Sequence, residues 1–279
     1  MIKIKTLNEL SLEVLLAAFN DAFAEYFVPI NLSKVQLALK LRVDQVDLSY
    51  SVGAFENGQL VAFILHGVAL HQGQYTAYNA GTGVVPTFRG QGITKQLYQF
   101  ALPLLHTAGI RYMLLEVIKE NNIAHKIYQQ IGFQTLRLVN CYQQKKPLLD
   151  TAPNRVQHHQ DKLIDLVPND DGTATWQNSP HAIAQYQGDA VQFLVQEQGV
   201  WLASLIVYKQ TGRILQLYVQ PEYRQKGIGS LLLGRAAQFF PGLSVINVDA
   251  TRKDLTSFFE HLGFECTLQQ YEMGLRPII

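Results

Sequence analysis

One stretch of this sequence occurs twice. Residues 84–97, VVPTFRGQGITKQL, return as residues 219–232, VQPEYRQKGIGSLL. A second landmark follows each copy, because IYQQIGF at residues 127–133 is matched by FFEHLGF at residues 258–264. Internal repetition over this length indicates two copies of one domain. We therefore expect a first domain at residues 1–146, a linker at 147–154 and a shortened second domain at 155–279.

Length and composition agree with this division. The chain has 279 residues, of which 48% are hydrophobic, enough to build two separate cores. The expected linker follows Lys145 and carries two prolines, Pro147 and Pro153, where the hydrophobic periodicity is lost.

Charge and hydropathy narrow the class of partner. The net charge is only +1 and no long run of Lys or Arg appears, which argues against a nucleic acid or an anionic membrane as the main partner. The first residues alternate like a strand and lack the apolar core of a signal peptide, and no apolar run is long enough to span a bilayer. We expect a soluble, cytoplasmic protein that recognises a small ligand.

Cysteines and histidines point to no metal site. Cys141 and Cys266 each follow a Gly-Phe pair, so duplication explains them better than a disulfide does, and we expect two buried, reduced thiols. The histidines show no ligand spacing. His158 and His159 fall in a polar stretch that resembles a linker, and residues 169–172, NDDG, are typical of a turn.

Hydrophobic periodicity predicts alternating helices and strands in both halves. In the first half we expect helices at 10–26, 31–43, 91–106 and 122–131, and strands at 51–55, 60–65, 75–85 and 112–118. Asn57-Gly58 predicts a hairpin between two of these strands. In the second half we expect strands at 191–196, 200–208, 214–219 and 243–248, and helices ending near 240 and at 254–261.

Each repeated stretch reads as a strand, an Arg- and Gly-bearing turn and the start of a helix. Glycine lets the backbone approach an anion closely, and the first turn of a helix has unpaired amides reinforced by the helix dipole. Gly90 and Gly92 in the first copy, and Gly227 in the second, therefore predict two phosphate-binding loops.

The pattern Val-x-Pro-x-x-Arg-x-x-Gly-x-Gly/Ala resembles the acyl-coenzyme A loop of the GNAT superfamily of N-acetyltransferases. Leu115-Glu116-Val117, Asn121, Tyr128 and Gly132-Phe133 stand at the spacing of that family's next conserved block. The resemblance covers most of residues 1–145 and, more faintly, 155–274. One departure is Thr94, where the family usually has Gly or Ala; a helical Thr94 would need no positive φ, and its hydroxyl could donate to phosphate.

The resemblance implies two tandem α/β (α+β) domains. Each would have a mixed, mostly antiparallel sheet flanked by helices, with the fourth and fifth strands splayed so that pantetheine bonds to a strand edge. Acetyl-coenzyme A would be the cofactor. The implied contacts are Gly83, Val84 and Val85 for pantetheine, Arg89, Gly90, Gln91, Gly92, Ile93 and Thr94 around the pyrophosphate, and Asn121 on the pantetheine arm. A possible second site comprises Val219, Arg224, Gln225, Lys226, Gly227, Ile228 and Gly229.

Two residues are candidates for proton transfer. A lysine-type amine has a pKa near 10.4, so neutralising it at pH 7 costs about 4.6 kcal/mol and favours a general base. Glu116 is a carboxylate in an apolar strand, which is costly without a role or a partner. Its alternatives are simple solvation or pairing with an arginine. Tyr128 matches the family's general acid, and its alternative is an amphipathic tyrosine with a solvated hydroxyl.

The second copy differs at these positions. Counting back from the Gly-Phe pairs, Tyr128 corresponds to Phe259, Glu116 to Asn247 and Asn121 to Arg252. The leading hypothesis is therefore an enzyme whose first domain transfers an acetyl group from acetyl-coenzyme A to a primary amine by direct attack. Its rivals are a non-catalytic acyl-coenzyme A sensor or scaffold, and catalysis in the second domain as in mycothiol synthase-like relatives.

The acceptor is less constrained than the acyl donor. A small-molecule or peptide amine is expected, and the oligomeric state is open. The family places its acceptor beside the first helix and fourth strand, whose candidates here are Asn20, Tyr26, Phe27, Tyr75, Tyr78, Asn79 and Thr82. Packing against the sheet is the alternative for these residues.

Overall fold

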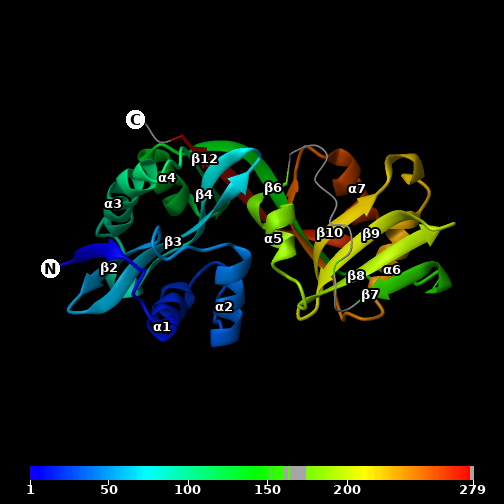
Figure 1. The fold of residues 1–279 in the computed structure, drawn as a ribbon, viewed down its shortest axis with the longest axis horizontal. Helices are drawn as coiled ribbons and strands as arrows, with labels where there is room; N and C mark the ends of the chain where they lie inside the picture. The colour runs from blue at the N-terminus through cyan, green and yellow to red at the C-terminus, as the bar shows by residue number, and fades with distance from the viewer. Residues whose placement is uncertain (152, 160–162, 164–173, 277–279) are drawn as a thin grey trace. The chain divides into compact units, whose positions relative to one another are not determined.

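The computed structural model describes residues 1–151, 153–159, 163 and 174–276. Contacts divide the chain into two units, each with its own strands and helices (Figure 1). Unit 1 comprises Met1–Leu136 and the chain from Tyr271 onward, and unit 2 comprises Arg137–Gln270. The expected linker at 147–154 lies within unit 2, and the boundary drawn from the repeat stays a prediction about where one copy ends.

Unit 1 has strands in the order β1-β2-β3-β4-β5-β12-β6. Its elements are β1 (Lys3–Thr6), α1 (Leu12–Phe23), α2 (Lys34–Val43), β2 (Val52–Glu56), β3 (Gln59–His71), β4 (Gln74–Val84), η1 (Pro86–Phe88), α3 (Ile93–Thr107), β5 (Tyr112–Ile118), α4 (Asn122–Ile131), the start of β6 (Gln134–Gln144) and the end of β12 (Phe264–Leu275). Strands β1 to β4 pair antiparallel, whereas β4 and β5 are parallel.

Local sequence explains most of these boundaries. Ser33 begins α2 with a capping box that includes Gln36. Asn57 and Gly58 both have positive φ, 49° and 83°, as the predicted hairpin turn requires. Helix α1 ends at Phe23, earlier than the expected residue 26. Strand β3 is longer than expected because its pairing with β4 continues to His71.

Alternation along β3 places helices on both faces of the sheet. Phe63 contacts the rings of Phe19 and Phe23 on α1, with centroids 5.8 and 6.4 Å away. The neighbouring residue Ile64 belongs to the opposite cluster, with Leu97 of α3. Side chains alternate between the two faces of a strand, so α1 and α3 cover opposite faces.

Strands β4 and β5 separate soon after they pair. Among the described residues their register covers Thr76–Tyr112, Ala77–Met113 and Tyr78–Leu114, although β4 continues to Val84 and β5 to Ile118. A register shift against β3 near Leu65 marks a bulge in the same part of β4. The splayed strands implied by the family resemblance are therefore present in unit 1.

Unit 2 repeats the plan with the strand order β12-β6-β11-β10-β9-β8-β7. Its further elements are η2 (Pro153–Arg155), β7 (Val156–His159), η3 (Trp176–Asn178), α5 (Pro180–Ala184), β8 (Ala190–Glu197), β9 (Val200–Tyr208), β10 (Arg213–Val219), η4 (Pro221–Tyr223), α6 (Ile228–Ala236), β11 (Ser244–Asp249) and α7 (Lys253–His261). The parallel pairing of β10 with β11 covers Arg213–Ser244 and Ile214–Val245, so these strands also separate early among the described residues.

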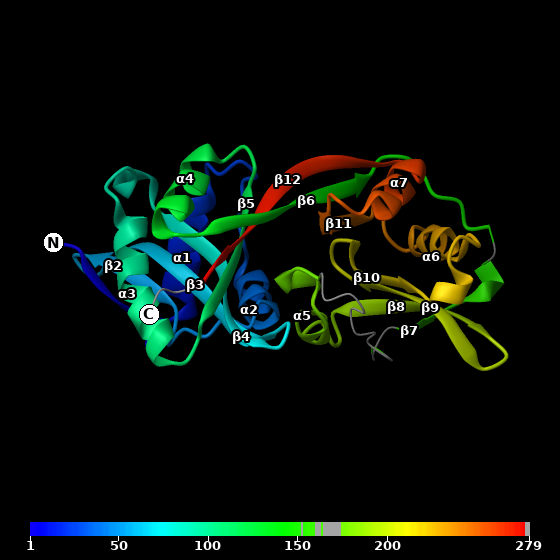
Figure 2. The same cartoon turned by 90° about the horizontal axis from the view of Figure 1, so that it is seen from above.

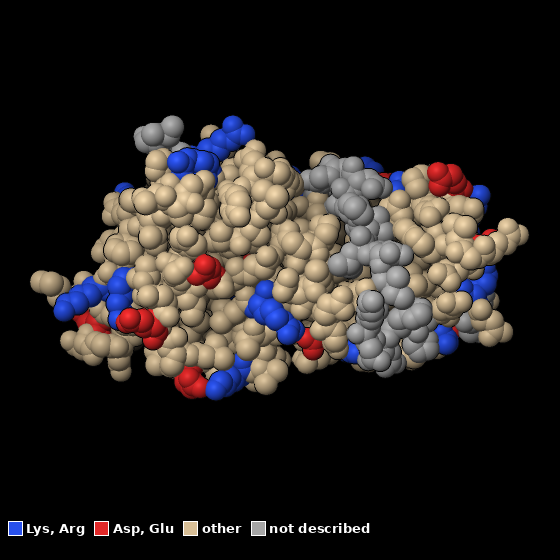
Figure 3. All heavy atoms as spheres, in the orientation of Figure 1, with Lys and Arg blue, Asp and Glu red and all other residues tan. Residues whose placement is uncertain are grey.

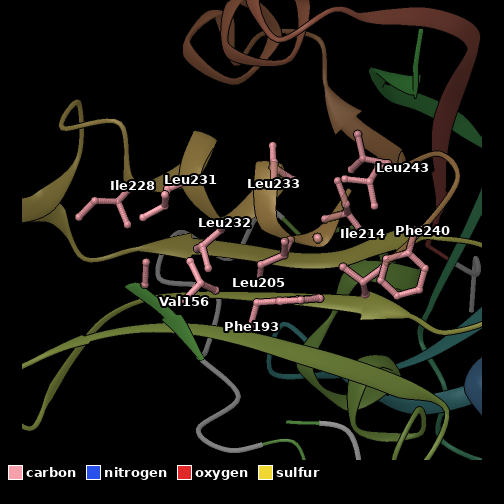
Figure 4. Packing of buried hydrophobic residues seen from close by; sticks show 14 of the residues in the cluster. Val156, Phe193, Leu205, Ile214, Ile228, Leu231, Leu232, Leu233, Phe240 and Leu243 are labelled. Carbon is pink, nitrogen blue, oxygen red and sulfur yellow. The ribbon is translucent and has the colours of Figure 1, made fainter. Parts of the chain in front are cut away.

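The core of unit 2 lies between α6 and its sheet. Helix α6 contacts strands β7 to β10 (Figure 2). Leu232 of α6 and Phe193 and Leu205 of the strands are fully buried, and Figure 4 shows them together. Burying side chains of this size stabilises a fold by about 1.5–3 kcal/mol each.

Two strands contribute to both units. Residues 137–144 of β6 lie in unit 2, where they pair with β11, and Tyr271–Leu275 of β12 lie in unit 1. Met273 and Leu275 are accordingly buried in the unit 1 core, and Tyr142 is buried in the unit 2 core. Figure 2 shows β6 and β12 side by side. Each core is therefore completed by residues that the repeat assigns to the other half.

Three expectations need correction or fall outside the structure. Cys141 is buried and reduced as expected, but Cys266 is exposed, because it lies in a run of three exposed residues, 265–267, near the start of β12. His158 and His159 belong to strand β7 and not to a linker, since they pair with Phe193 and Gln192. The turn expected at residues 169–172 lies outside the described residues.

The described residues form no large patch of a single charge on the face drawn in Figure 3. Acidic and basic side chains are interspersed on the face drawn in Figure 3. No helix in the described ranges has both the length and the apolarity to cross a bilayer. A search of the same residues finds no group of three or more His, Cys, Asp or Glu that could hold a metal ion.

His66 on β3 supplies a pH-dependent contribution to stability. It is fully buried, its Nδ1 lies 2.8 Å from the Tyr50 carbonyl oxygen, and its Nε2 has no hydrogen-bond partner among the described residues. Burial lowers the pKa of His66 from 6.5 to about 4, with the Tyr50 bond opposing the shift. Between those pH values the unfolded chain binds a proton that the folded chain does not.

We expect the free energy of unfolding to fall by about 1.4 kcal/mol per pH unit below pH 6.5 because of this residue. His66→Asn retains an N–H donor for the Tyr50 carbonyl and removes the titration. Urea unfolding at pH 7, 6 and 5 should show a shallower pH dependence for the variant. Equal slopes for both proteins would contradict the assignment.

Candidate active site

The repeated sequence forms the same backbone structure in both units. We call residues 84–94 loop 1 and residues 219–229 loop 2. In loop 1, Arg89 has φ −66° and ψ 158°, and Gly92 is a left-handed N-cap with φ 70°. The corresponding values in loop 2 are −64° and 158° for Arg224 and a φ of 77° for Gly227. The second left-handed position is Gly90 in loop 1, φ 76°, and Gln225 in loop 2, φ 60°.

The amides at the end of loop 1 begin helix α3. The first helical bond joins the Gln96 amide to the Gly92 carbonyl at 3.3 Å, so the amides of Ile93 and Thr94 precede the first intrahelical bond. Thr94 is already helical, which satisfies the condition for tolerating a β-branched residue there. A Cβ added at Gly90 or Gly92 would meet no described atom within 4 Å. Loop 1 therefore presents an open, amide-lined concavity suited to an anion.

Arg89 braces loop 1 against helix α1. Its Nε donates to the Val84 carbonyl at 3.3 Å, and its guanidinium donates to the Ala22 carbonyl at 3.1 Å and to Glu25 at 3.2 Å. Arg224 repeats the first of these bonds, to the Val219 carbonyl at 3.0 Å. The sequence predicted Arg89 as a pyrophosphate ligand; in the structure its donors hold the protein backbone and a carboxylate.

The predicted pantetheine residues lie at the end of β4. A Cβ on Gly83 would come within 3 Å of the Phe63 ring and of Ala22, so only glycine fits between the sheet and α1. The Val85 amide donates to the Val61 carbonyl on β3 at 2.9 Å. The stretch after Tyr78 is not paired with β5 in the described structure, which leaves an edge where an extended ligand can add.

Glu116 lies on β5 where the strands begin to separate. It is half-buried, and its Oε2 accepts a hydrogen bond from the Tyr78 hydroxyl at 2.6 Å. Tyr78 comes from β4 and is 4% exposed. The carboxylate therefore has a tyrosine hydroxyl as a partner. A 2.6 Å contact is typical of a hydroxyl bonded to an ionised carboxylate.

Tyr128 lies on α4 and is buried against two aromatic rings. Its ring makes edge contacts with Tyr98 and Phe133 at 6.2 and 5.7 Å. Burial raises the pKa of Tyr128, and hydrogen bonding to Thr82 and Asn79 opposes that shift. The phenol therefore carries its proton at neutral pH. The packed ring agrees with one part of the alternative considered from the sequence, and the role of Tyr128 as the general acid stays a prediction.

Asn79 organises the surroundings of Tyr128. Its Nδ2 donates to the Thr82 hydroxyl at 2.8 Å and to the Tyr98 hydroxyl at 2.9 Å, while its Oδ1 accepts from the Gly81 amide at 3.0 Å. From the sequence, Asn79 and Thr82 were named only as acceptor-side or packing candidates, and Tyr98 was not singled out. The available signal in the sequence was the polar side chains of Asn79 and Thr82 on a strand that also carries two glycines. This pattern could have predicted a buried hydrogen-bond network.

The remaining candidates have structural contacts. Asn121 is the N-cap of α4, accepting from the Ala124 amide at 3.1 Å, and its Nδ2 lies 3.5 Å from the Tyr26 hydroxyl. Its role on the pantetheine arm stays a prediction. Asn20 bonds both backbone groups of Leu32. Tyr75 and Phe27 are exposed, at 64% and 57%.

Unit 2 contains a cleft of about 700 Å³ between its separating strands. The cleft is lined by β10 from Ile214 onward, loop 2, Val245 and Val248 of β11, and the first turns of α7. All residues of the possible second site line it except Lys226, whose ammonium lies 5.1 Å from the Tyr223 ring centroid. Its volume is in the range of small-molecule sites.

The proton-transfer positions of unit 2 are occupied differently. Asn247 lies in a bulge of β11 and has a φ of 57°. Its Oδ1 accepts a hydrogen bond from Gln270 at 2.8 Å. Asn247 is not among the residues that line the cleft. Phe259 is buried against Tyr142 and Phe264, with ring centroids 5.8 and 5.3 Å away. Arg252 pairs with Asp254 through two bonds of 3.0 and 2.9 Å.

Comparison with known protein families gives two matches. Residues 15–133 match the acetyltransferase (GNAT) family, and residues 164–276 match an acetyltransferase (GNAT) domain. Among curated proteins, N-alpha-acetyltransferase 30 of Schizosaccharomyces pombe is 28% identical over 85 residues, 30% of this chain. The [ribosomal protein bS18]-alanine N-acetyltransferase of Haemophilus ducreyi is 31% identical over 87 residues, 31% of this chain. The matched part spans 57% of each of these relatives.

Solved structures agree over the whole chain. A tandem GNAT protein from the clavulanic acid biosynthesis pathway has a TM-score of 0.75 at 15% identity and covers 100% of this chain and 99% of its own. A putative acetyltransferase from Pyrococcus horikoshii has a TM-score of 0.73 at 15% identity, covering 100% and 90%. These likenesses show the fold. With both family matches and the duplicated, splayed architecture, they establish that the chain belongs to the GNAT acetyltransferase family as a tandem two-domain member.

Proposed function

We propose that unit 1 transfers the acetyl group of acetyl-coenzyme A to a primary amine. The observation that carries this proposal is the arrangement around one pair of separating strands. The amide-lined concavity of loop 1 lies at the end of β4, Glu116 lies where β5 leaves it, and Tyr128 lies on the following helix. Neighbouring elements would therefore bind the anionic thioester and supply the two proton-transfer groups.

Loop 1 would bind the diphosphate through backbone amides. The concavity has room where a Cβ at Gly90 or Gly92 would stand, and the helix dipole of α3 favours negative charge there. Arg89 would act indirectly by holding the loop against α1. The pantetheine amides would pair with the edge of β4 beyond Tyr78.

The reaction is a direct displacement at the thioester carbonyl. The amine nitrogen forms a bond to the carbonyl carbon, and the carbon–sulfur bond breaks. Glu116 takes a proton from the amine, directly or through water, and Tyr128 gives one to the departing thiolate. Each side chain exchanges one proton and returns to its starting state through solvent. No covalent enzyme intermediate is required.

An α-amino group is the acceptor class that best fits this machinery. The two curated relatives are named as acetylating protein α-amines or a ribosomal-protein alanine. An α-amine has a pKa near 7.7–8.0, so its neutral form at pH 7 costs only about 1 kcal/mol, against about 4.6 kcal/mol for a lysine side chain. A single carboxylate already bonded to a phenol is a modest base, which suits the weaker acid–base demand.

A second function is favoured by the cleft of unit 2. The cleft of about 700 Å³ is lined by loop 2, whose backbone matches loop 1, but Phe259 and the turned-away Asn247 supply no proton-transfer group. We propose that unit 2 binds an acyl-coenzyme A without turnover. This assignment makes catalysis in the second domain the less supported alternative.

The proton-transfer assignments predict a loss of rate without loss of structure. Tyr128→Phe and Glu116→Gln should each lower kcat by about 100-fold, because general acid or base catalysis contributes at least that factor. Release of coenzyme A thiol with a peptide N-terminal amine is the measurement.

Tyr50→Phe provides the matched control, since Tyr50 is a partly buried tyrosine of unit 1 that lies outside β4, β5 and loop 1. Its kcat should stay within twofold of the wild-type value. Wild-type kcat in Tyr128→Phe would remove the assigned acid, and thiol release with no amine of the panel would contradict the proposed transfer.

If loop 1 binds the diphosphate, an acidic substitution there should weaken acetyl-coenzyme A binding by more than backbone strain alone explains. Gly92→Asp and Gly58→Asp both place a side chain at positive φ in open space, 70° and 83°. Both should therefore lose about 1 kcal/mol of unfolding free energy. Only Gly92→Asp should weaken acetyl-coenzyme A binding, by at least about tenfold, because it adds a carboxylate where the phosphates bind. Equal affinity in both variants, measured by calorimetry, would place the diphosphate elsewhere.

Unit 2 predicts a second binding event. Calorimetric titration of the wild-type protein with acetyl-coenzyme A should show two sites per chain, and Gly227→Asp should remove one of them by the same charge repulsion. A stoichiometry of one that Gly227→Asp leaves intact would show that the unit 2 cleft does not take this ligand.

A further inference from the structure

Tyr78 lies at the last paired position before β4 and β5 separate. It is opposite Leu114, and Glu116 follows two residues later on β5. Residues two apart on a strand project from the same face, and so do residues opposite each other in neighbouring strands. Tyr78 and Glu116 are therefore diagonal neighbours on one face, where the strands begin to part.

The bond between them spans the start of the gap. The Tyr78 hydroxyl donates to Glu116 Oε2 at 2.6 Å. Because the strands no longer pair at Glu116, this side-chain bond joins β4 to β5 at a level where their backbones do not. A charge-assisted bond of this kind restricts the rotamers that a glutamate side chain can adopt.

The chemistry of each group matches this arrangement. A buried phenol requires an acceptor, and Tyr78 is only 4% exposed. Glu116 is flanked on its strand by Leu115 and Val117, both buried, so its carboxylate depends on polar contacts with other elements. The flanking residues supply none through their side chains.

We propose that Tyr78 is a positioning residue that orients the Glu116 carboxylate for proton removal from the acceptor amine. This inference rests on the proposed function of unit 1. Tyr78 contributes no atom to the reaction. Its hydroxyl fixes the position of Oε2, and this orients the plane of the carboxylate. The carboxylate would then lie where the separated strands leave room for the thioester.

A purely packing role for Tyr78 makes a different prediction. A tyrosine that only packs affects kcat independently of Glu116. The fold-losses in kcat from the two substitutions would then multiply in the double variant. A residue that acts only through Glu116 has no further effect once the carboxylate is gone. A double-mutant cycle separates these cases.

The test compares kcat for Tyr78→Phe, Glu116→Gln and the double variant, using acetyl-coenzyme A and a peptide N-terminal amine. We expect Tyr78→Phe to lower kcat about tenfold, the size of effect that one lost hydrogen bond to a charged group produces. The KM for acetyl-coenzyme A should change less than about twofold, since loop 1 is unaltered. In the Glu116→Gln background the same substitution should change kcat by less than about twofold.

Tyr50→Phe is the matched control, because Tyr50 is a partly buried tyrosine of unit 1 that lies outside β4, β5 and loop 1. It should leave kcat unchanged in both backgrounds. Melting temperatures are measured for every variant. Tyr78→His, which keeps a ring N–H donor, is the second variant and should recover part of the kcat that Tyr78→Phe loses.

Three outcomes would overturn the inference. Equal fold-losses from Tyr78→Phe in the wild-type and Glu116→Gln backgrounds would show that Tyr78 acts independently of Glu116. Wild-type kcat in Tyr78→Phe would show that the bond does not matter to the reaction. If the wild-type protein acetylates the amine and gives either of these results, only the inference about Tyr78 is wrong. If the wild-type protein acetylates no amine, the proposed function is wrong as well, and the inference with it.

Discussion

The separation of β4 from β5 is the constraint on which the unit 1 site depends. Their parallel pairing ends at Tyr78 and Leu114, yet both strands continue. A strand interior cannot leave its backbone groups unbonded without cost, so the gap is tolerated where a ligand or water can bond to the edge. The same separation brings Glu116 to the start of the gap, where it accepts a hydrogen bond from Tyr78.

Duplication preserved backbone geometry more faithfully than side-chain chemistry. Loop 2 keeps the dihedral angles of loop 1 even where Gln225 replaces a left-handed glycine, a conformation that costs a non-glycine residue about 1 kcal/mol. The positions of Glu116 and Tyr128 are instead held by a bulged Asn247 and a core Phe259. The loop backbone was thus retained in unit 2, whereas the residues at the Glu116 and Tyr128 positions changed.

Pairing of strands was the part of the fold that the repeat could not reveal. Strands β6 and β12 each begin after a Gly-Phe pair and end in the other unit, so that Met273 completes the core of unit 1 and Tyr142 that of unit 2. Nothing in either strand's composition distinguishes these pairings from pairing within its own half. Cys266 was expected to be buried, but it lies in an exposed run near the start of β12.

Periodicity and turn chemistry were enough to predict β5, α4, the Asn57-Gly58 hairpin and the backbone of both glycine-bearing loops, because helices and turns are specified by neighbouring residues. Glu116 and Tyr128 were proposed as proton-transfer residues from similarly local signals, a carboxylate in an apolar strand and a tyrosine at the family's spacing. Contacts between distant residues had no such local signal. Only the tertiary structure decided that Tyr78 bonds Glu116, that Arg89 holds α1, that Asn247 turns away from its cleft and that the last strands cross between units, because each depends on residues brought together by the fold.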